Sequence, residues 1–303
     1  MKRQVYIFAL ILIWIILVSC SDTKYDTLDN IQQIDMKSIP EKDFDDYVDE
    51  LTCIPLSKSA NGIRDCWKLI AYKEYFYLYS LSDFAVLIYT QNGNLIKRID
   101  GRGKGKIETP TDILINRQQD ELWICDSGKE LVKYDLCGNF IERVSLPTLC
   151  IKMEFVQEKA LLTYADFFEQ KDDYLFHSYT NEWHDKRDFI LKEGVTNAPT
   201  SYPPSLFAQD WQTQTIYALF RLKGLIYIYQ NTQLSPFLYL DFGNDLLTID
   251  KYPRQGFSDE QMDDIINNKR YIHTLNAFHV INGKMFFKTE GKDAYYYLIS
   301  LHD

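Results

Sequence analysis

A glycine-rich segment that carries three cations is the first place where this sequence could bind a ligand. Residues 99–106 read I-D-G-R-G-K-G-K, so Arg102, Lys104 and Lys106 alternate with glycines. Phosphate-binding loops also combine glycine with lysine, but they follow the pattern Gly-x-x-x-x-Gly-Lys-[Ser/Thr] and lead into a helix. The sequence lacks that pattern, and strand-like residues follow. We therefore interpret these glycines as permitting a tight turn between strands.

The histidines and carboxylates do not form a recognisable catalytic motif. The sequence contains neither a Gly-x-Ser-x-Gly elbow nor a His-Glu-x-x-His helix. A zinc site would need several ligands to converge, and no spacing of Cys and His indicates one. We therefore expect no metal, no cofactor and no catalytic residue, although the carboxylates are too numerous to exclude glycoside hydrolysis by motif. The five histidines are His177, His184, His273, His279 and His302.

The N-terminus has the features of an export signal. Lys2 and Arg3 precede an unbroken apolar run, Val5 to Val18, that is shorter than the ~20 residues of a transmembrane helix. The run ends in Leu17-Val18-Ser19-Cys20, which resembles the lipobox of bacterial lipoproteins. That resemblance implies a signal peptide over residues 1–19 and a lipid-modified Cys20. It also implies a location in the bacterial cell envelope, at the outer membrane, on either its periplasmic or its surface side. A plain signal peptide and an uncleaved anchor are the alternatives.

Five cysteines remain after Cys20, and an odd number in an exported chain leaves at least one free thiol. We interpret them mainly as small buried hydrophobic residues. A Cys53–Cys66 or a Cys125–Cys137 bridge stays open. The five are Cys53, Cys66, Cys125, Cys137 and Cys150.

The charge of the chain argues against nucleic acid as a partner. The formal net charge is −10, and it becomes −12 when Lys2 and Arg3 leave with the signal peptide. A strongly acidic domain repels a phosphate backbone. The composition is otherwise globular, with 46% apolar and 25% charged residues, and its 15% aromatic content favours strands.

A repeat of 45 residues predicts the architecture. Residues 89–98 read Y-T-Q-N-G-N-L-I-K-R and residues 134–143 read Y-D-L-C-G-N-F-I-E-R, so Tyr89 recurs as Tyr134 and Gly93 as Gly138. Each segment ends a set of four short strands in which a glycine turn joins the third to the fourth. A fixed period of this size in a strand-rich chain is typical of an all-β propeller with four-stranded antiparallel blades.

The blade count leaves an open question. About five blades can be recognised in residues 41–303, and we expect residues 46–56 to be a strand that closes the ring. Residues 20–40 read as a polar tether after the lipid. An insert at about 242–270 contains Ser258 and Gln261 at capping-box spacing, which predicts a short helix over 259–268. Either the ring has five blades, or a sixth is missing because the chain is truncated.

Residues 99–112 resemble the loop between blades of NHL-type propellers. The glycines at 101, 103 and 105, then Pro110 and Asp112, match that pattern, whereas its usual Pro-Gly pair is replaced by Lys106-Ile107. The closest likeness is to the six-bladed β-propeller lipoproteins of Bacteroidetes. Residues 47–147 and the segment Tyr239–Asn244 carry it. The resemblance implies six blades, which favours truncation, and it implies no settled activity.

Loops between blades and loops joining second to third strands share one face of such a propeller. We expect this face to hold the ligand, with Phe167-Phe168 either stacking on a sugar or packing beneath the loop. The first functional hypothesis is a non-enzymatic module that binds a protein or a glycan. The alternative is a propeller enzyme, a lyase or hydrolase, with its active site at the axial mouth. The candidate ligand-binding residues on that face are Asp83, Arg102, Lys104, Asp126, Lys129, Phe167 and Phe168.

Overall fold

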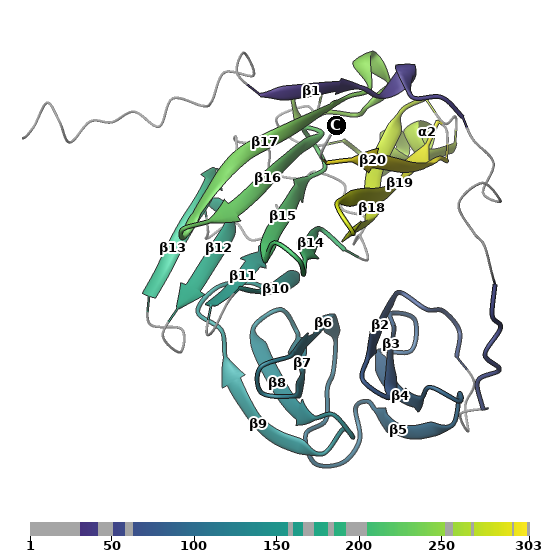
Figure 1. The fold of residues 1–303 in the computed structure, drawn as a ribbon, viewed down its shortest axis with the longest axis vertical. Coiled ribbons are helices and arrows are strands. Elements are labelled where there is room, and N and C mark those ends of the chain that lie inside the picture. Colours follow the sequence, from purple (N-terminus) through teal and green to yellow (C-terminus); the bar gives the residue numbers. More distant parts are fainter. Residues whose placement is uncertain are drawn as a thin grey trace, which may run out of the picture.

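The computed structural model describes residues 31–41, 51–57, 63–156, 160–165, 173–180, 185–191, 205–251, 257–267, 270–292 and 294–301. In these residues the fold is all-β, and five sheets are arranged around a common centre (Figure 1). No helix of this part of the chain is long and apolar enough to cross a membrane. The predictions for Cys20, Phe167, Phe168, His184 and His302 lie outside the described residues.

The first two blades confirm the four-stranded unit that the 45-residue repeat predicts. Within each sheet, successive strands pair antiparallel in chain order. Gly93 and Gly138 occupy the matching turns with φ values of 79° and 81°, a conformation that glycine adopts without steric cost. The strands are β2 (Lys68–Tyr72), β3 (Tyr75–Ser80), β4 (Ala85–Thr90), β5 (Leu95–Ile99), β6 (Pro110–Asn116), β7 (Glu121–Asp126), β8 (Glu130–Asp135) and β9 (Phe140–Ser145).

Two more four-stranded blades and a three-stranded sheet follow. The three-stranded sheet begins with the longest inner strand, which contains a β-bulge between Asn276 and His279. The strands are β10 (Lys152–Val156), β11 (Ala160–Tyr164), β12 (Tyr174–Thr180), β13 (Asp185–Leu191), β14 (Phe207–Asp210), β15 (Thr215–Phe220), β16 (Leu225–Gln230), β17 (Gln233–Asp241), β18 (Ile272–Ile281), β19 (Lys284–Gly291) and β20 (Tyr296–Ser300).

Tyrosines connect the first two blades, which accounts for part of the aromatic bias. Tyr77, Tyr79 and Tyr134 are almost fully buried between the sheets. Tyr77 donates its hydroxyl hydrogen bond to the Leu136 carbonyl at 3.0 Å, and Tyr79 donates to the Pro110 carbonyl of the next blade. Each ring thus buries its apolar body while its hydroxyl satisfies a backbone acceptor. The interpretation of these tyrosines as blade packing is confirmed.

The N-terminal segment corrects part of the predicted tether. β1 (Gln32–Asp35) pairs in parallel with β17, and the 3₁₀ turn η2 (Met36–Ser38) follows it. Met36 is buried in the cluster formed by the fourth and fifth blades. The prediction of an unstructured tether was therefore wrong for residues 32–38. An apolar side chain and an unpaired sheet edge outweighed the polar composition of this stretch.

The predicted closing strand is also corrected where the structure describes it. Residues 51–57 form no strand, and residues 42–50 lie outside the description. Ser57 instead binds the turn between β4 and β5. Its amide donates to the Gly93 carbonyl at 2.7 Å, and its hydroxyl accepts from the Leu95 amide at 2.7 Å. This stretch therefore covers the outer turn of the first blade instead of completing the last one.

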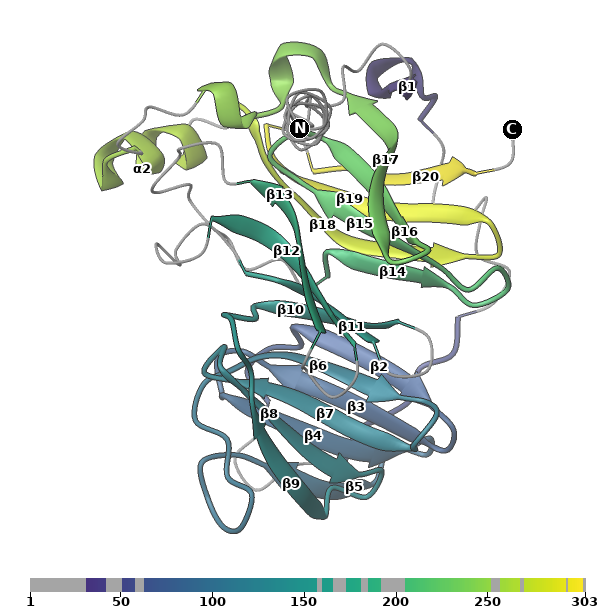
Figure 2. The ribbon, with the colours of Figure 1, turned by 90° about the vertical axis from the view of Figure 1, so that its left-hand side faces the viewer.

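The insert between the fourth and fifth blades contains the predicted helix. After the turns η5 (Gly243–Asp245) and η6 (Ile249–Lys251), α2 spans Asp259–Asn267. The capping box is present, because the Ser258 hydroxyl accepts from the Gln261 amide at 3.2 Å and Gln261 Oε1 accepts from the Ser258 amide at 2.9 Å. Figure 2 shows α2 beside the upper blades, away from the first two.

Candidate functional site

The predicted ligand-binding face is made of residues with local partners. Asp83 accepts hydrogen bonds from the Arg64 guanidinium and amide and from the Ser80 hydroxyl, and Arg64 lowers the pKa of this carboxyl to about 2. Arg102 forms an ion pair with Asp100 at 2.6 Å. The Lys104 ammonium lies 5.7 Å from the centre of the Phe140 ring. Each of these side chains holds a loop in place.

Asp126 anchors the glycine-rich loop to the second blade. Its carboxylate is buried and accepts from the amides of Glu108 and Thr109, both at 2.9 Å, and it pairs with Arg143 at 3.2 Å. Asp126 also lines an open depression of about 450 Å³ beside that loop. Lys129 is exposed on the following turn. Five of the seven predicted residues therefore have a described position. The other two, Phe167 and Phe168, lie outside the described residues.

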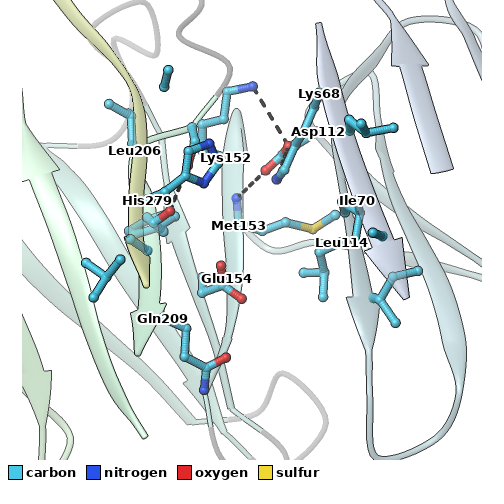
Figure 3. A pocket seen from close by; sticks show the side chains of 18 of the residues that line it. Lys68, Ile70, Asp112, Leu114, Lys152, Met153, Glu154, Leu206, Gln209 and His279 are labelled. Atoms are coloured by element: carbon cyan, nitrogen blue, oxygen red, sulfur yellow. Dashed lines mark hydrogen bonds and ion pairs between the residues drawn. The ribbon is translucent and has the colours of Figure 1, made fainter. Parts of the chain in front are cut away.

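The inner strands of all five sheets instead surround a pocket of about 550 Å³ at the propeller axis. Its wall contains side chains from the inner strand of every sheet, namely β2, β6, β10, β14 and β18 (Figure 3). Its volume lies in the range of small-ligand sites in proteins. Neither Asp83, Arg102, Lys104, Asp126 nor Lys129 lines it.

Three charged residues occupy equivalent positions on the inner strands of the first three blades. Lys68, Asp112 and Lys152 each stand four residues before the last paired residue of their strand. Lys68 Nζ lies 2.8 Å from Asp112 Oδ1, and Lys152 Nζ lies 3.9 Å from the same oxygen. The second oxygen, Asp112 Oδ2, accepts from the Met153 amide at 3.0 Å. Repetition of the blade therefore creates a Lys–Asp–Lys array across three sheets.

This array is buried to different depths. The side chains of Asp112 and Lys152 are each 1% exposed, whereas that of Lys68 is 17% exposed toward the pocket. Lys152 Nζ donates to the Thr111 carbonyl at 3.0 Å, which satisfies one of its three donors. Burial nevertheless lowers the pKa of Lys152 to about 8, while Asp112 opposes the change and Lys68 adds to it.

Two residues before the ends of their strands, Glu154 on β10 and His279 on β18 face the same pocket (Figure 3). Burial raises the pKa of the Glu154 carboxyl, and Lys68 opposes that rise. Burial lowers the pKa of His279, and the positive charge of Lys68 lowers it further. Burial therefore disfavours the charged form of both groups.

Polar atoms without partners also line the pocket. Among the residues that the structure describes, neither Gln209 Oε1 nor Trp67 Nε1 has a hydrogen-bond partner, although both atoms are buried. At the other end of the inner strands, the Arg117 guanidinium lies 3.9 Å from the centre of the Trp211 ring. A buried acceptor and a buried donor that remain unpaired cost free energy.

No cluster of three or more His, Cys, Asp and Glu side chains suited to a metal is found in the described part of the chain. His273 and His279 both belong to β18, but only His279 lines the axial pocket. The pocket can accept and donate hydrogen bonds and can hold an anionic or a neutral polar group. Glu154 and His279 are its candidates for proton transfer.

Replacing Lys152 by Met is expected to remove a pH dependence of folding. Below pH 8 the folded protein keeps a buried charge that the unfolded chain would solvate. Between pH 8 and 10 the unfolded lysine, with its ordinary pKa of 10.5, binds more protons than the folded one, so the free energy of unfolding rises with pH.

Between pH 7 and 10, the free energy of unfolding of the wild type should rise by about 2 kcal/mol relative to that of the Lys152→Met variant. Urea unfolding at each pH measures this difference. Lys129→Met, at an exposed position, controls for the loss of one positive charge. Parallel curves for wild type and Lys152→Met would show that Lys152 is not desolvated in the folded protein.

The sequence placed an alternative active site at the axial mouth but did not identify the residues that line this pocket, although a signal was present. Lys68 and Lys152 each open an inner strand whose other residues are mainly apolar, in K-L-I-A-Y and K-M-E-F-V. Asp112 had been identified only as the acidic residue of the NHL-type pattern. Aligning the inner strands from their hairpin turns would have placed the three charges at one level.

The comparisons with known proteins agree with this fold. A family model described as a 6-bladed beta-propeller matches residues 23–300. The chain belongs to this 6-bladed β-propeller family. The predicted resemblance is thereby confirmed. The family has six blades, and the described residues of this chain form five sheets. No curated protein matches the chain.

Among solved structures, the propeller is similar to one of Bacteroides fragilis named as an exported protein. The two are 16% identical, the match covers 83% of this chain and 73% of that one, and the TM-score is 0.68. A protein of Bacteroides vulgatus is 11% identical over 77% of this chain and 78% of that one, with a TM-score of 0.49. Virginiamycin B lyase from Staphylococcus aureus is 9% identical over 78% and 70%, with a TM-score of 0.44. At these identities the likeness concerns the fold.

Proposed function

We propose that this protein is an exported, lipid-anchored and non-enzymatic binding module that holds a glycan in its axial pocket. The observation that carries the proposal is the axial pocket of about 550 Å³ that five inner strands share, because its wall combines the rings of Trp67 and Trp211 with polar side chains such as Gln209. Saccharide hydroxyl groups both donate and accept hydrogen bonds, so one ligand can use donors and acceptors of this wall. Lys68, Glu154 and His279 add further polar contacts in the same wall.

A glycan fits this pocket better than a protein partner does. A stable protein interface buries on the order of 800 Å² on each side and is formed on a broad surface. The axial site is a concavity of about 550 Å³, which suits one or a few sugar units or a chain end. Trp67 and Trp211 also line it, and an aromatic ring offers an apolar face for the C–H groups of a pyranose.

A second candidate function rests on Glu154 and His279. A carboxyl group with a raised pKa and an imidazole with a lowered pKa are the kinds of group that serve as general acid and base near neutral pH. If the bound glycan is cleaved, these two residues are the candidates for proton transfer, and the protein is a lyase or hydrolase acting at the axial mouth.

Export and anchoring follow from the N-terminal sequence. The apolar run from Val5 to Val18 followed by Ser19-Cys20 supports cleavage before Cys20 and lipid attachment there. More than one acyl chain gives stable membrane attachment without a transmembrane span. A propeller tethered in this way at the outer membrane would capture glycans at the cell envelope.

The test is a thermal-shift screen of the chain from Ser21 with neutral and acidic oligosaccharides, peptides and divalent metals. A ligand that binds only the folded state at 100 times its Kd stabilises that state by about 2.7 kcal/mol. We expect a glycan to raise the melting temperature of the wild type and to raise that of Gln209→Leu much less. Gln230→Leu, an exposed position on β16, is the matched control and should respond like the wild type.

Two results would overturn the binding proposal. Hits confined to peptides or metals would exclude a glycan as the ligand. Equal shifts for the wild type and Gln209→Leu would place the glycan outside the axial pocket. Release of shortened sugars from the bound glycan, lost in Glu154→Gln and retained in Gln230→Leu, would instead establish the enzymatic alternative.

A further inference from the structure

Two buried cysteines from different parts of the fold lie side by side between the second and third blades. Cys125 is the penultimate residue of β7, and Cys150 lies two residues before the start of β10. Both are free and buried, at 0% and 1% exposed. They belong to one apolar cluster with Leu131, Met153 and Leu161. The chain therefore brings together two thiols that are 25 residues apart.

Hydrogen bonds hold this pair in place from both sides. The Cys125 thiol donates to the Cys150 carbonyl at 3.1 Å. The same carbonyl accepts from the Thr111 hydroxyl at 3.1 Å, and the Cys150 amide donates to the Gly128 carbonyl at 2.7 Å. The neighbouring Cys125 side chain and burial raise the pKa of Cys150. The backbone at Cys150 is thus fixed against the second blade beside the Cys125 thiol, while the Cys150 thiol donates to the Lys152 carbonyl at 3.5 Å.

The bridges considered from the sequence do not have this geometry. Cys137 lies in the turn between β8 and β9, where its sulfur contacts the Tyr75 hydroxyl at 3.5 Å. That turn is at the opposite end of the blade from Cys125, since Glu121 and not Cys125 pairs with Asp135. Cys53, Cys66 and Cys137 are all exposed and free. Cys125–Cys150 is the pair that the fold brings into contact among the described cysteines.

We propose that Cys125 and Cys150 are a redox pair whose disulfide joins the second blade to the third. The oxidant is a disulfide, carried by a thiol oxidoreductase in the envelope or by oxidised glutathione. The thiolate of one cysteine attacks the oxidant and displaces one of its sulfurs as a thiol. The second thiolate then attacks the mixed disulfide and displaces the other. The protein loses two electrons and two protons, and the oxidant becomes two thiols.

The disulfide would act directly on the wall of the axial pocket. Lys152 follows Cys150 by two residues, and its ammonium donates to the carbonyl of Thr111, whose hydroxyl binds the Cys150 carbonyl. Asp112 follows Thr111 and accepts from the Met153 amide. A covalent link from Cys150 to Cys125 on β7 therefore fixes the start of β10 against the second blade, next to the Lys–Asp–Lys array. Because burial suppresses the thiolate, we expect slow exchange in the folded protein and faster exchange during folding.

The experiment equilibrates the full-length chain, solubilised in detergent, with glutathione buffers of defined redox potential. Samples are quenched in acid, unfolded, alkylated and digested, and the peptides are identified by mass. We expect a Cys125–Cys150 linked peptide, two hydrogen masses lighter than the sum of its parts. The oxidised protein should melt roughly 5 °C above the reduced one, because the link closes a loop of about 25 residues.

Cys125→Ser should abolish both the linked peptide and the difference in melting temperature, whereas Cys66→Ser, at an exposed cysteine, should retain both. Cys125→Ser also alters a buried position. If that variant fails to fold, the linked peptide and the difference in melting temperature between oxidised and reduced wild type test the proposal without it. Complete alkylation of Cys125 and Cys150 at every potential would overturn the proposal. So would linkage of either one to Cys53, Cys66 or Cys137.

Discussion

Replacing Asp112 by Ala is expected to lower the free energy of unfolding by about 3–5 kcal/mol, the range seen when one member of a buried ion pair is removed. Asp112 is the only carboxylate within ion-pair distance of both Lys68 and Lys152 among the described residues. Without it, the ammonium group of Lys152 remains buried at 1% exposure with no counter-charge. The Met153 amide also loses its acceptor. Urea unfolding at pH 7 measures the change.

A double-mutant cycle separates the charge effect from the loss of packing. Lys152→Met in the Asp112→Ala background removes the uncompensated charge, so part of the lost stability should return. Glu108→Ala is the matched control, because Glu108 pairs with Lys106 at the surface at 3.0 Å and its removal should change stability little. If Asp112→Ala destabilises no more than Glu108→Ala, the buried array does not exist as described.

Replacing Cys20 by Ala should release the protein from the membrane fraction and abolish its labelling by a fatty-acid precursor. The apolar run before Cys20 contains 14 residues, which is short for a stable span, so we expect the proposed lipid to carry the attachment. The effect is all-or-none, because lipid transfer requires the cysteine thiol. Fractionation of cells followed by immunoblotting measures it.

Cys53→Ala is the control for this experiment, since Cys53 is an exposed cysteine outside the leader. It should keep both the label and the membrane location. Continued acyl labelling of Cys20→Ala would show that the lipid attaches elsewhere. Loss of the label with retention in the membrane fraction would show that the apolar run itself is an uncleaved anchor.

The blade architecture could be predicted because its determinants are local. Gly93 and Gly138 must adopt positive φ in equivalent turns, and Tyr89 of β4 and Tyr134 of β8 are both buried at equivalent positions. These demands recur every 45 residues and are visible in the sequence. The helix α2 was predictable for the same reason, since Ser258 and Gln261 bind each other within one turn.

The N-terminal strand and the pocket depend on contacts between distant segments. Gln32–Asp35 becomes a strand because β17 offers an unpaired edge, although nothing in its own polar sequence demands it. Lys68, Asp112 and Lys152 are separated by 44 and 40 residues and meet only after three blades have formed. The charged loop residues Asp126 and Arg102 were candidate ligand contacts in the sequence, but Asp126 pairs with Arg143 and Arg102 pairs with Asp100.

The most direct test of the axial site is a crystal structure of the chain with the glycan that gives the largest thermal shift. We expect ligand density between the inner strands, with sugar hydroxyl groups beside Gln209, Trp67 and Lys68. Density on the outer loops near Asp126 and Lys129, with the axial pocket unchanged, would contradict it.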